Sequence, residues 1–333
     1  MNKRKKIAII GICIVFCTCI IAANYLFFGV PGSAPEEKIV YIDKDDTPDS
    51  VLSKTKLGWR GNILSIFLPF KHARTGRYII EPNTDILTLY RKLRNGQQDP
   101  ILLTIPTVRT MDRLAGVISK KLMLDSLTLV NALTDEEFCR EWGYETSTLP
   151  ALFIPNTYEI YWDISLNGLM KRMQKENEAF WNTTRGQKAK ALGLTHEEIC
   201  TLASIVDEET ANDTEKPIIA GLYLNRLRKG MLLQADPTVK FAVGDFSLRR
   251  ILGEHLKKES PYNTYLNIGL PPGPIRIASI KGLDAVLDHS EHNYLYMCAK
   301  ADFSGTHEYA ATFNEHKKNA RNYIRALNER NIH

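Results

Sequence analysis

Residues 7–30 constrain this chain most, because "IAIIGICIVFCTCIIAANYLFFGV" contains no charged side chain. A membrane-spanning helix needs about 20 apolar residues, whereas a secretory signal has about 7–15 followed by a small-residue cleavage site. No convincing cleavage site follows here, and the preceding "MNKRKK" is basic, which favours a cytoplasmic location for that end. The sequence therefore predicts a cytoplasmic tail over 1–6 and a single-pass anchor over 7–30 in the cell membrane. The rest of the chain is expected outside the cytoplasm.

The charge balance of the remaining chain excludes one class of function. The 333 residues carry 43 basic and 38 acidic side chains, and four of the basic ones lie in residues 3–6. The rest is close to neutral, which argues against a nucleic-acid binder that relies on a broad basic surface. A hydrophobic content of 44% and a charged content of 24% indicate a folded protein, and the length allows two modest domains.

Cysteine and histidine spacing gives no sign of a metal or a disulfide framework. Cys139, Cys200 and Cys298 are far apart, and we expect them to be buried free thiols. The segment "DHSEH" at 288–292 resembles a metal site only loosely. The pair at 196–197 does not continue as a zinc-protease motif, because Cys200 occupies the position of its second histidine. No metal and no cofactor are predicted.

Turn and cap signals divide the chain outside the predicted anchor. The segment 31–37, "PGSAPEE", is typical of a linker. Two strand-to-helix units follow: a strand over 38–42 before a helix capped by Thr47, and a strand around 78–80 before a helix capped by Thr84 that ends at Gly96. They predict a small α+β domain over 38–100 and a second domain over 101–333. In the second domain, "MLLQADPTVKFAV", "SPYNTYLNIGLPPGPI" and "NYLYMCA" predict ordered loops over a cleft.

The segment "ASIVDEET" at 203–210 places three acids at the end of an apolar run. A helix over 196–211, with Thr195 as N-cap and Glu198 in a capping box, accounts for the pattern. Its predicted buried stripe consists of Ile199, Leu202, Ala203 and Val206, widened to one side by Ile205. At about 100° per residue, Glu209 falls on the Ile205 side, Glu208 nearly opposite and Asp207 on the far flank. Glu209 is therefore the acid predicted to face protein.

This spacing leaves two interpretations of Glu209. It forms an ion pair with Arg226 or Arg228, or it is a catalytic acid, since a carboxyl group removed from water has a raised pKa and can donate a proton near neutral pH. The following loops favour a carbohydrate cleft, because their side chains can hydrogen-bond to sugars and stack on them. These residues are Gln234, Asp236, Thr238, Tyr262, Asn263, Thr264 and Tyr265.

Four blocks, "LASIVDEET", "LYLNRLRKGMLLQADPTV", "SPYNTYLNIGLPPGPI" and "YLYMCAKADFSGTHEYAATFNEH", resemble the signature blocks of the YceG-like family of endolytic murein transglycosylases in order and spacing. The resemblance covers most of the chain. It implies an α+β fold with an N-terminal transmembrane helix, a small LysM-like α+β domain over 38–100 and a mixed α/β catalytic domain over 101–333. It also implies that the catalytic acid is the glutamate directly before the threonine, which is Glu209.

Three positions depart from the family pattern. The first acid of the triplet is usually glutamate and is Asp207 here. The segment 104–110 is "TIPTVRT" and lacks the usual Glu-Gly pair. The segment 149–158 is "LPALFIPNTY", in which Asn156 replaces an acid. The last departure concerns substrate placement around Asn156 and Tyr158, and none of the three affects Glu209.

The resemblance implies cleavage of the β-1,4 bond between N-acetylmuramic acid and N-acetylglucosamine within nascent peptidoglycan strands. The products would carry 1,6-anhydro ends, strand elongation would stop, and the partners would be the membrane-bound machinery of peptidoglycan synthesis. The predicted substrate-binding residues are Asp207, Arg226, Gln234, Asp236, Thr238, Tyr262, Asn263, Thr264, Tyr265, Tyr158 and His307. Arg226 remains open between a ligand and an ion-pair partner.

Two alternatives remain at this level. A glycoside hydrolase needs two carboxyl groups that face each other across the bond. Asp207 and Glu209 are two residues apart on a helix and do not face each other, so Asp236 would have to be the second. The other alternative is a non-enzymatic scaffold in which the LysM-like region binds glycan and the second domain is inactive.

Overall fold

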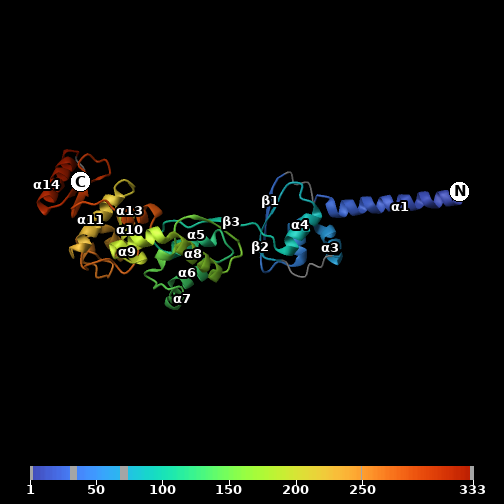
Figure 1. Ribbon diagram of the computed structural model, residues 1–333, viewed down its shortest axis with the longest axis horizontal. Coiled ribbons are helices and arrows are strands. Elements are labelled where there is room, and N and C mark those ends of the chain that lie inside the picture. The colour runs from blue at the N-terminus through green and yellow to red at the C-terminus, as the bar shows by residue number, and fades with distance from the viewer. Residues whose placement is uncertain (1–2, 31–35, 68–73, 249, 331–333) are drawn as a thin grey trace. The chain divides into compact units, whose positions relative to one another are not determined.

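A computed structural model of the chain describes residues 3–30, 36–67, 74–248 and 250–330 (Figure 1). The chain divides into two compact units. Unit 1 comprises residues 1–103, 121–124 and 158–165, and unit 2 comprises residues 104–120, 125–157 and 166–333. Most of the predicted linker, and the start of the predicted tail, lie outside the described residues. The LysM-like character of residues 38–100 stays a prediction.

Helix α1, Lys3–Phe28, is the apolar helix that the sequence predicts. Its stretch Arg4–Phe28 is long and apolar enough to cross a membrane, and it is the one such helix in the described part of the chain. The side chains of its most apolar stretch are not buried against the rest of the protein. An apolar helix without a protein partner needs another apolar surrounding, which is consistent with a membrane anchor.

The rest of unit 1 is a small α+β layer structure. Strand β1, Lys38–Ile42, pairs antiparallel with β2, Gly76–Ile80, in a register that sets Val40 opposite Tyr78. Helices α2, Pro48–Lys54, α3, Gly58–Phe67, and α4, Ile86–Asn95, complete the core (Figure 1). Because strand side chains alternate, one face of β1 packs Val40 and Ile42 against the helices.

The local signals for unit 1 are largely confirmed. Thr47 caps α2, with its side chain accepting from the Ser50 N–H. Gly96 ends α4 with a φ of 65°, a left-handed conformation that favours glycine. The prediction that Thr84 caps α4 is wrong by one residue, because the side chain of Asp85 accepts from the Thr88 N–H. Strand β3, Ile101–Thr104, pairs with β4, Thr157–Ile160.

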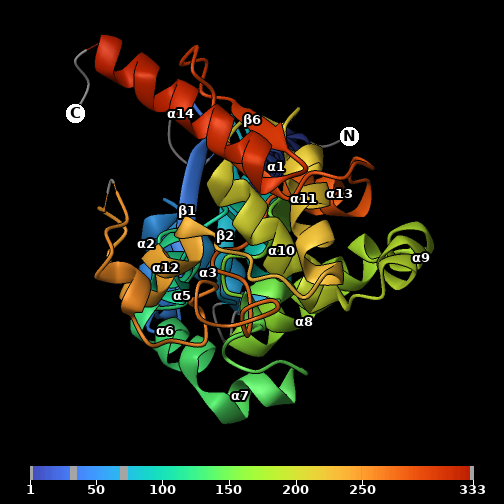
Figure 2. The same ribbon diagram turned by 90° about the vertical axis from the view of Figure 1, so that its left-hand side faces the viewer.

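Helix α10, His196–Glu209, lies at the centre of unit 2 and contacts α9, α11, α12 and α13 (Figure 2). Residues 199–206 are all buried, so the predicted apolar stripe is buried and the other faces of this part of the helix are covered as well. The predicted capping box of Thr195 and Glu198 is present and fixes where the helix begins.

The other helices of this unit are α5 (Met111–Ser119), α6 (Ser126–Thr134), α7 (Glu136–Glu141), α8 (Leu166–Phe180), α9 (Thr183–Leu192), α11 (Lys216–Arg228), α12 (Asp236–Val243), α13 (Ile280–Leu287) and α14 (Phe313–Glu329), with short 3-10 turns at Leu149–Leu152 and His255–Lys257.

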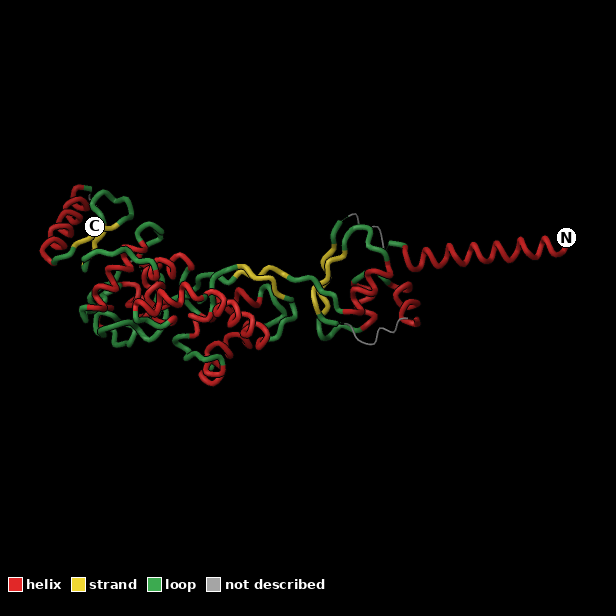
Figure 3. Tube along the Cα trace, in the orientation of Figure 1, coloured by secondary structure: helices red, strands yellow, loops and turns green. Residues whose placement is uncertain are grey.

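Two segments of unit 2 differ from the predicted loops. The segment from Asp236 forms helix α12, and "YMCA" forms strand β5, Tyr296–Ala299, which pairs antiparallel with β6, His307–Ala310. Figure 3 shows helices joined by long loops across this unit. Helix α14 packs on β5 and β6. The chain is thus an α+β protein, and unit 2 is largely helical instead of the expected mixed α/β domain.

Cysteine burial follows the prediction at two of three positions. Cys139 and Cys200 are buried free thiols, whereas Cys298 is partly exposed. Burial raises the pKa of the Cys200 thiol, so this side chain stays protonated and unreactive near neutral pH.

Candidate active site

Asp207 is the first of the three acids and is held entirely by protein. Its carboxylate accepts from the Ser279 N–H at 2.6 Å and the Ser279 hydroxyl at 2.8 Å, and it pairs with Lys216 Nζ at 2.9 Å. Its side chain is 4% exposed. A Cβ on Gly282 would lie 2.6 Å from Asp207 Oδ1, so this approach requires the glycine. Both oxygens of Asp207 already have partners within the protein, which indicates a structural role, and substrate binding by Asp207 stays a prediction.

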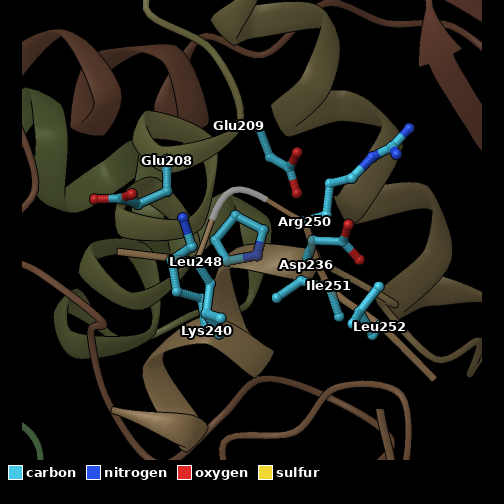
Figure 4. Close-up of a pocket in the computed structure, with 9 residues that line it drawn as sticks. Glu208, Glu209, Asp236, Lys240, Leu248, Arg250, Ile251 and Leu252 are labelled. Atoms are coloured by element: carbon cyan, nitrogen blue, oxygen red, sulfur yellow. The ribbon is translucent and has the colours of Figure 1, made fainter. Parts of the chain in front are cut away.

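Glu208 is also paired, although the helical wheel predicts it on the outer face. Arg109 binds it with two bonds of 2.8 and 2.7 Å, and Arg276 Nη1 adds a third at 3.0 Å. Its side chain is only 10% exposed, because the segments carrying these two arginines cover it. Two cations therefore neutralise Glu208, and in Figure 4 it points away from Glu209.

Glu209 is the last residue of α10, and its environment differs from that of its neighbours. Its Oε1 accepts from the Tyr223 hydroxyl at 2.7 Å. No ion pair joins it to a cation among the residues that the structure describes. The interpretation of a Glu209 ion pair with Arg226 is wrong, because Arg226 donates to the carbonyls of Leu295, Leu232 and Leu233.

Burial raises the pKa of Glu209 from 4.5 to about 7. The nearby charges of Asp236 and Glu208 add to this rise, whereas the Tyr223 hydrogen bond and the charge of Arg226 oppose it. Its place at the carboxyl end of α10 also disfavours negative charge. Near neutral pH a large share of Glu209 is therefore protonated, which suits a group that donates a proton and later accepts one.

Two cavities meet at Glu209 and Asp236. The larger has a volume of 600 Å³ and the smaller 240 Å³, and both acids line both of them. The larger is also lined by Glu208, Pro237, Lys240, Leu248, Arg250, Ile251 and Leu252 (Figure 4). The smaller is also lined by Leu222, Tyr223, Arg226, Leu233, Gln234, Tyr265, Met297, Cys298, Ala299 and His307. A long ligand could therefore extend to either side of Glu209.

The structure brings five of the predicted binding residues to Glu209: Arg226, Gln234, Asp236, Tyr265 and His307. Asp236 begins α12, accepts from the Tyr265 hydroxyl at 2.5 Å, and lies near Glu209 in Figure 4. Gln234 has a φ of 50°, so the chain turns sharply just before this acid. These side chains form one wall of the site together.

Other predicted binding residues make contacts within the protein and not with the cavities. Thr238 and Thr264 are buried, with their hydroxyls 2.8 Å apart. The buried Asn263 side chain donates to the carbonyls of Leu256 and Lys258. Tyr262 packs on the Phe241 ring at 4.7 Å and lines neither cavity. Tyr158 is buried within β4 and also lines neither cavity, so the predicted substrate-binding role of these five residues gains no support from the two cavities and stays a prediction.

Sequence reasoning missed Tyr223 and Glu215. A buried tyrosine needs a partner for its hydroxyl, which is the one signal that could have drawn attention to Tyr223. Glu215 accepts from the His307 N–H at 2.7 Å and the Tyr309 hydroxyl at 2.9 Å, which fixes His307 in the cavity wall. No spacing rule connects Glu215 with a strand more than 90 residues further on.

Two side chains of the segment 288–292 have partners within the protein. Asp288 pairs with Lys188 at 2.5 Å, and His292 Nε2 lies 2.8 Å from the Ile218 carbonyl oxygen. Among the residues with described positions, no group of three His, Cys, Asp or Glu side chains could hold a metal ion.

Comparison with known proteins finds relatives over most of this chain. The sequence model of the YceG-like family matches residues 40–322. The endolytic murein transglycosylase of Bacillus subtilis (strain 168) is 29% identical over 300 residues, which are 84% of this chain and 82% of the relative. The protein of the same name from Streptococcus pneumoniae serotype 2 is 25% identical over 338 residues, which are 90% of this chain and 59% of the relative.

A crystal structure supports the fold assignment. A protein from Listeria monocytogenes described as YceG-like superposes with a TM-score of 0.56 at 24% identity. The match covers 86% of this chain and 99% of that one. Because the family match extends over most of its length, this chain belongs to the YceG-like family.

Proposed function

We propose that this chain is a membrane-anchored lytic transglycosylase that cuts within peptidoglycan glycan strands, with Glu209 as its catalytic acid and base. The names of the two relatives, both endolytic murein transglycosylases, support the reaction class. The observation that carries the assignment is the contrast within the acid triplet. Asp207 and Glu208 are ion-paired, whereas Glu209 is bound by a tyrosine, has a pKa of about 7 and faces both cavities.

One carboxyl group suffices for the proposed reaction. Protonated Glu209 gives its proton to the glycosidic oxygen between N-acetylmuramic acid and N-acetylglucosamine, and the C1–O bond breaks. The resulting carboxylate takes the proton of the C6 hydroxyl of the muramic acid as that oxygen bonds to C1. The strand end is then a 1,6-anhydro sugar, water is not consumed, and Glu209 is protonated again.

The cavities support cleavage inside a strand instead of at its end. Glu209 and Asp236 lie where the 600 Å³ and 240 Å³ cavities meet, so sugars can bind on both sides of the broken bond. Gln234, Tyr265 and His307 offer hydrogen bonds on the smaller side, and Lys240 and Arg250 on the larger side. Cleavage of a nascent strand there would end its elongation.

The anchor supports a location beside the enzymes that make the polymer. We propose that α1 spans the cell membrane with residues 1–6 in the cytoplasm, because four basic residues precede the apolar stretch. Both units then lie outside the cytoplasm, where peptidoglycan is made. The LysM-like domain over 38–100 would bind glycan, and the partners would be the membrane-bound polymerising and crosslinking enzymes.

Hydrolysis is the second candidate, because Asp236 lies beside Glu209. In that mechanism Asp236 would act as the second carboxylate and water would replace the C6 hydroxyl. The 2.5 Å bond from Tyr265 instead suits an Asp236 that orients the site, since the bond occupies one of its oxygens.

Product analysis distinguishes the candidates. The full chain in detergent is incubated with uncrosslinked glycan strands, and the products are identified by mass spectrometry. We expect cleavage inside the strands to give fragments that carry 1,6-anhydro ends. Reducing ends that incorporate labelled oxygen from water would contradict lytic cleavage and favour hydrolysis. Bound but uncut glycan would favour a scaffold.

The pH dependence tests the protonated form of Glu209. Because the acid form starts the reaction, kcat/KM should fall as the pH rises through about 7, the pKa of Glu209. Tyr223→Phe removes a bond that stabilises the carboxylate, so the fall should move to higher pH, by up to about one unit. Initial rates between about pH 5 and pH 9 measure both profiles. Tyr144→Phe is the matched control without a contact to Glu209, and an unmoved or lowered Tyr223→Phe profile would refute the assignment.

A further inference from the structure

Helix α3 is apolar on two opposite faces. Gly61 and Leu64 are buried on the face toward the core of unit 1. On the opposite face, Trp59 is 59% and Ile66 is 73% exposed. These two residues are seven apart, and with the partly exposed Ile63 they form one stripe. Large apolar side chains that form a stripe on a helix are normally covered, so the outer face of α3 lacks its cover.

The end of α1 is fixed to the same part of unit 1. The guanidinium of Arg60, in α3, lies 3.9 Å from the centre of the Tyr25 ring, in α1. The Gly29 carbonyl accepts from the Ile86 N–H at 3.1 Å, and Phe27 packs on the core of unit 1. Contacts with α3, α4 and the core therefore fix the last turn of α1, instead of leaving it on a free tether.

These contacts set the depth of α3 relative to a membrane. About 20 residues cross the hydrocarbon layer, so a span that begins at Ile7 ends near Leu26. Tyr25 and Phe27 then lie at the membrane–water boundary, where tyrosine and tryptophan are enriched. Arg60 stacks on Tyr25, and its neighbour Trp59 therefore lies at a similar depth.

We propose that α3 lies on the outer surface of the bilayer that α1 crosses, with Trp59, Ile63 and Ile66 in the boundary between headgroups and acyl chains. This inference rests on the proposed anchoring by α1 and adds a second attachment. Lipid is the occupant that fits, because the stripe lies on the helix whose Arg60 stacks on Tyr25, near the end of the apolar helix α1. Helices that lie in this boundary present tryptophan and long aliphatic side chains to the lipid, and the stripe on α3 has the same composition. Unit 1 is then held against the membrane instead of moving freely above it.

Quenching of tryptophan by brominated lipid tests the proposal. The full chain is reconstituted into vesicles of phosphatidylcholine and phosphatidylglycerol whose acyl chains are either unmodified or brominated near the headgroup. We expect the brominated vesicles to reduce the tryptophan fluorescence of wild type by the part that one of its four tryptophans contributes. Trp59→Phe should abolish this quenching, and the matched control Trp142→Phe, in unit 2, should keep it.

The outcomes separate this proposal from the others. Unquenched wild type, or quenching that persists in Trp59→Phe, would overturn the placement of α3. Resistance of the chain to carbonate extraction tests the anchoring by α1 separately. Loss of the chain from the vesicles during this extraction would overturn both the anchoring and the placement of α3. Glycan cleavage by the same preparations reports on the proposed activity independently of either result.

Discussion

Replacing Glu209 with glutamine is expected to lower kcat for glycan cleavage by about 10³-fold to 10⁴-fold and to change KM little. Glutamine keeps the size of the side chain and can still accept from the Tyr223 hydroxyl. It cannot give a proton to the glycosidic oxygen or take one from the C6 hydroxyl. Both steps of the proposed reaction are lost together, and this makes the expected effect the largest of any single substitution. Timed release of 1,6-anhydro products from defined strands measures it.

A matched control separates this loss from general damage to α10. Glu197→Gln makes the same chemical change in the first turn of the same helix, far from both cavities. It should keep activity within about twofold, since this side chain lines neither cavity and takes no part in the Thr195–Glu198 capping box. Retention of more than about a tenth of the activity by Glu209→Gln would exceed what the loss of a general acid allows and would refute the assignment.

The same substitution should stabilise the folded chain at alkaline pH. The pKa of Glu209 is raised on folding, so the folded state holds its proton more tightly than the unfolded state. Below the unfolded pKa of 4.5 both states are protonated, and above about 7 the folded state must hold an unfavourable carboxylate. Glu209→Gln should therefore be more stable than wild type by about 1–3 kcal/mol near pH 8.5 and nearly equal to it near pH 4. Urea unfolding at the two pH values measures this, and a less stable variant at pH 8.5 would contradict the raised pKa.

The helical wheel identified the acid with the unusual environment but not the reason for it. Apolar spacing places Glu209 on the side of Ile205, and this is enough to predict that it meets protein. It also predicts that Glu208 meets water, and the structure overturns that. Helix spacing gives direction only, whereas Arg109 and Arg276 come from segments about 99 and 68 residues away in sequence. What covers each acid depends on tertiary packing.

Composition identified the loops of the site but not the role of each polar residue. Gln234 and Asp236 line the cavities, whereas the neighbouring Thr238 bonds to Thr264 and holds two loops together. Both kinds of residue are polar, and sequence alone cannot tell a satisfied hydroxyl from a free one. Strand β5 was missed for a related reason, because Tyr296–Ala299 is short and its pairing with β6 is set by contacts across a seven-residue connection.

Asp207→Ala should destabilise unit 2 by about 2–4 kcal/mol, because it breaks a buried ion pair and removes two hydrogen bonds. Lys216 is 8% exposed and would keep only Asp213, whose side chain is 42% exposed, as an acidic partner. The Ser279 N–H and hydroxyl, at the start of α13, would also lose their acceptor. For a unit of this size the change corresponds to a fall in Tm of roughly 5–15 °C. Thermal unfolding of the full chain in detergent, followed by circular dichroism, measures it.

Asp213→Ala is the matched control for this prediction. It removes the other carboxylate that binds Lys216, but that carboxylate is exposed and its pairs are screened by solvent. Its effect on stability should be much smaller than that of Asp207→Ala. If Asp207 instead bound the glycan, Asp207→Ala would keep the Tm of wild type and raise KM, as loss of uniform binding does. An unchanged KM with a lowered Tm would show that Asp207 is structural and holds α13 and Lys216 against α10. These contacts would then keep α10 in place, and with it Glu209, the last residue of that helix and the proposed catalytic group.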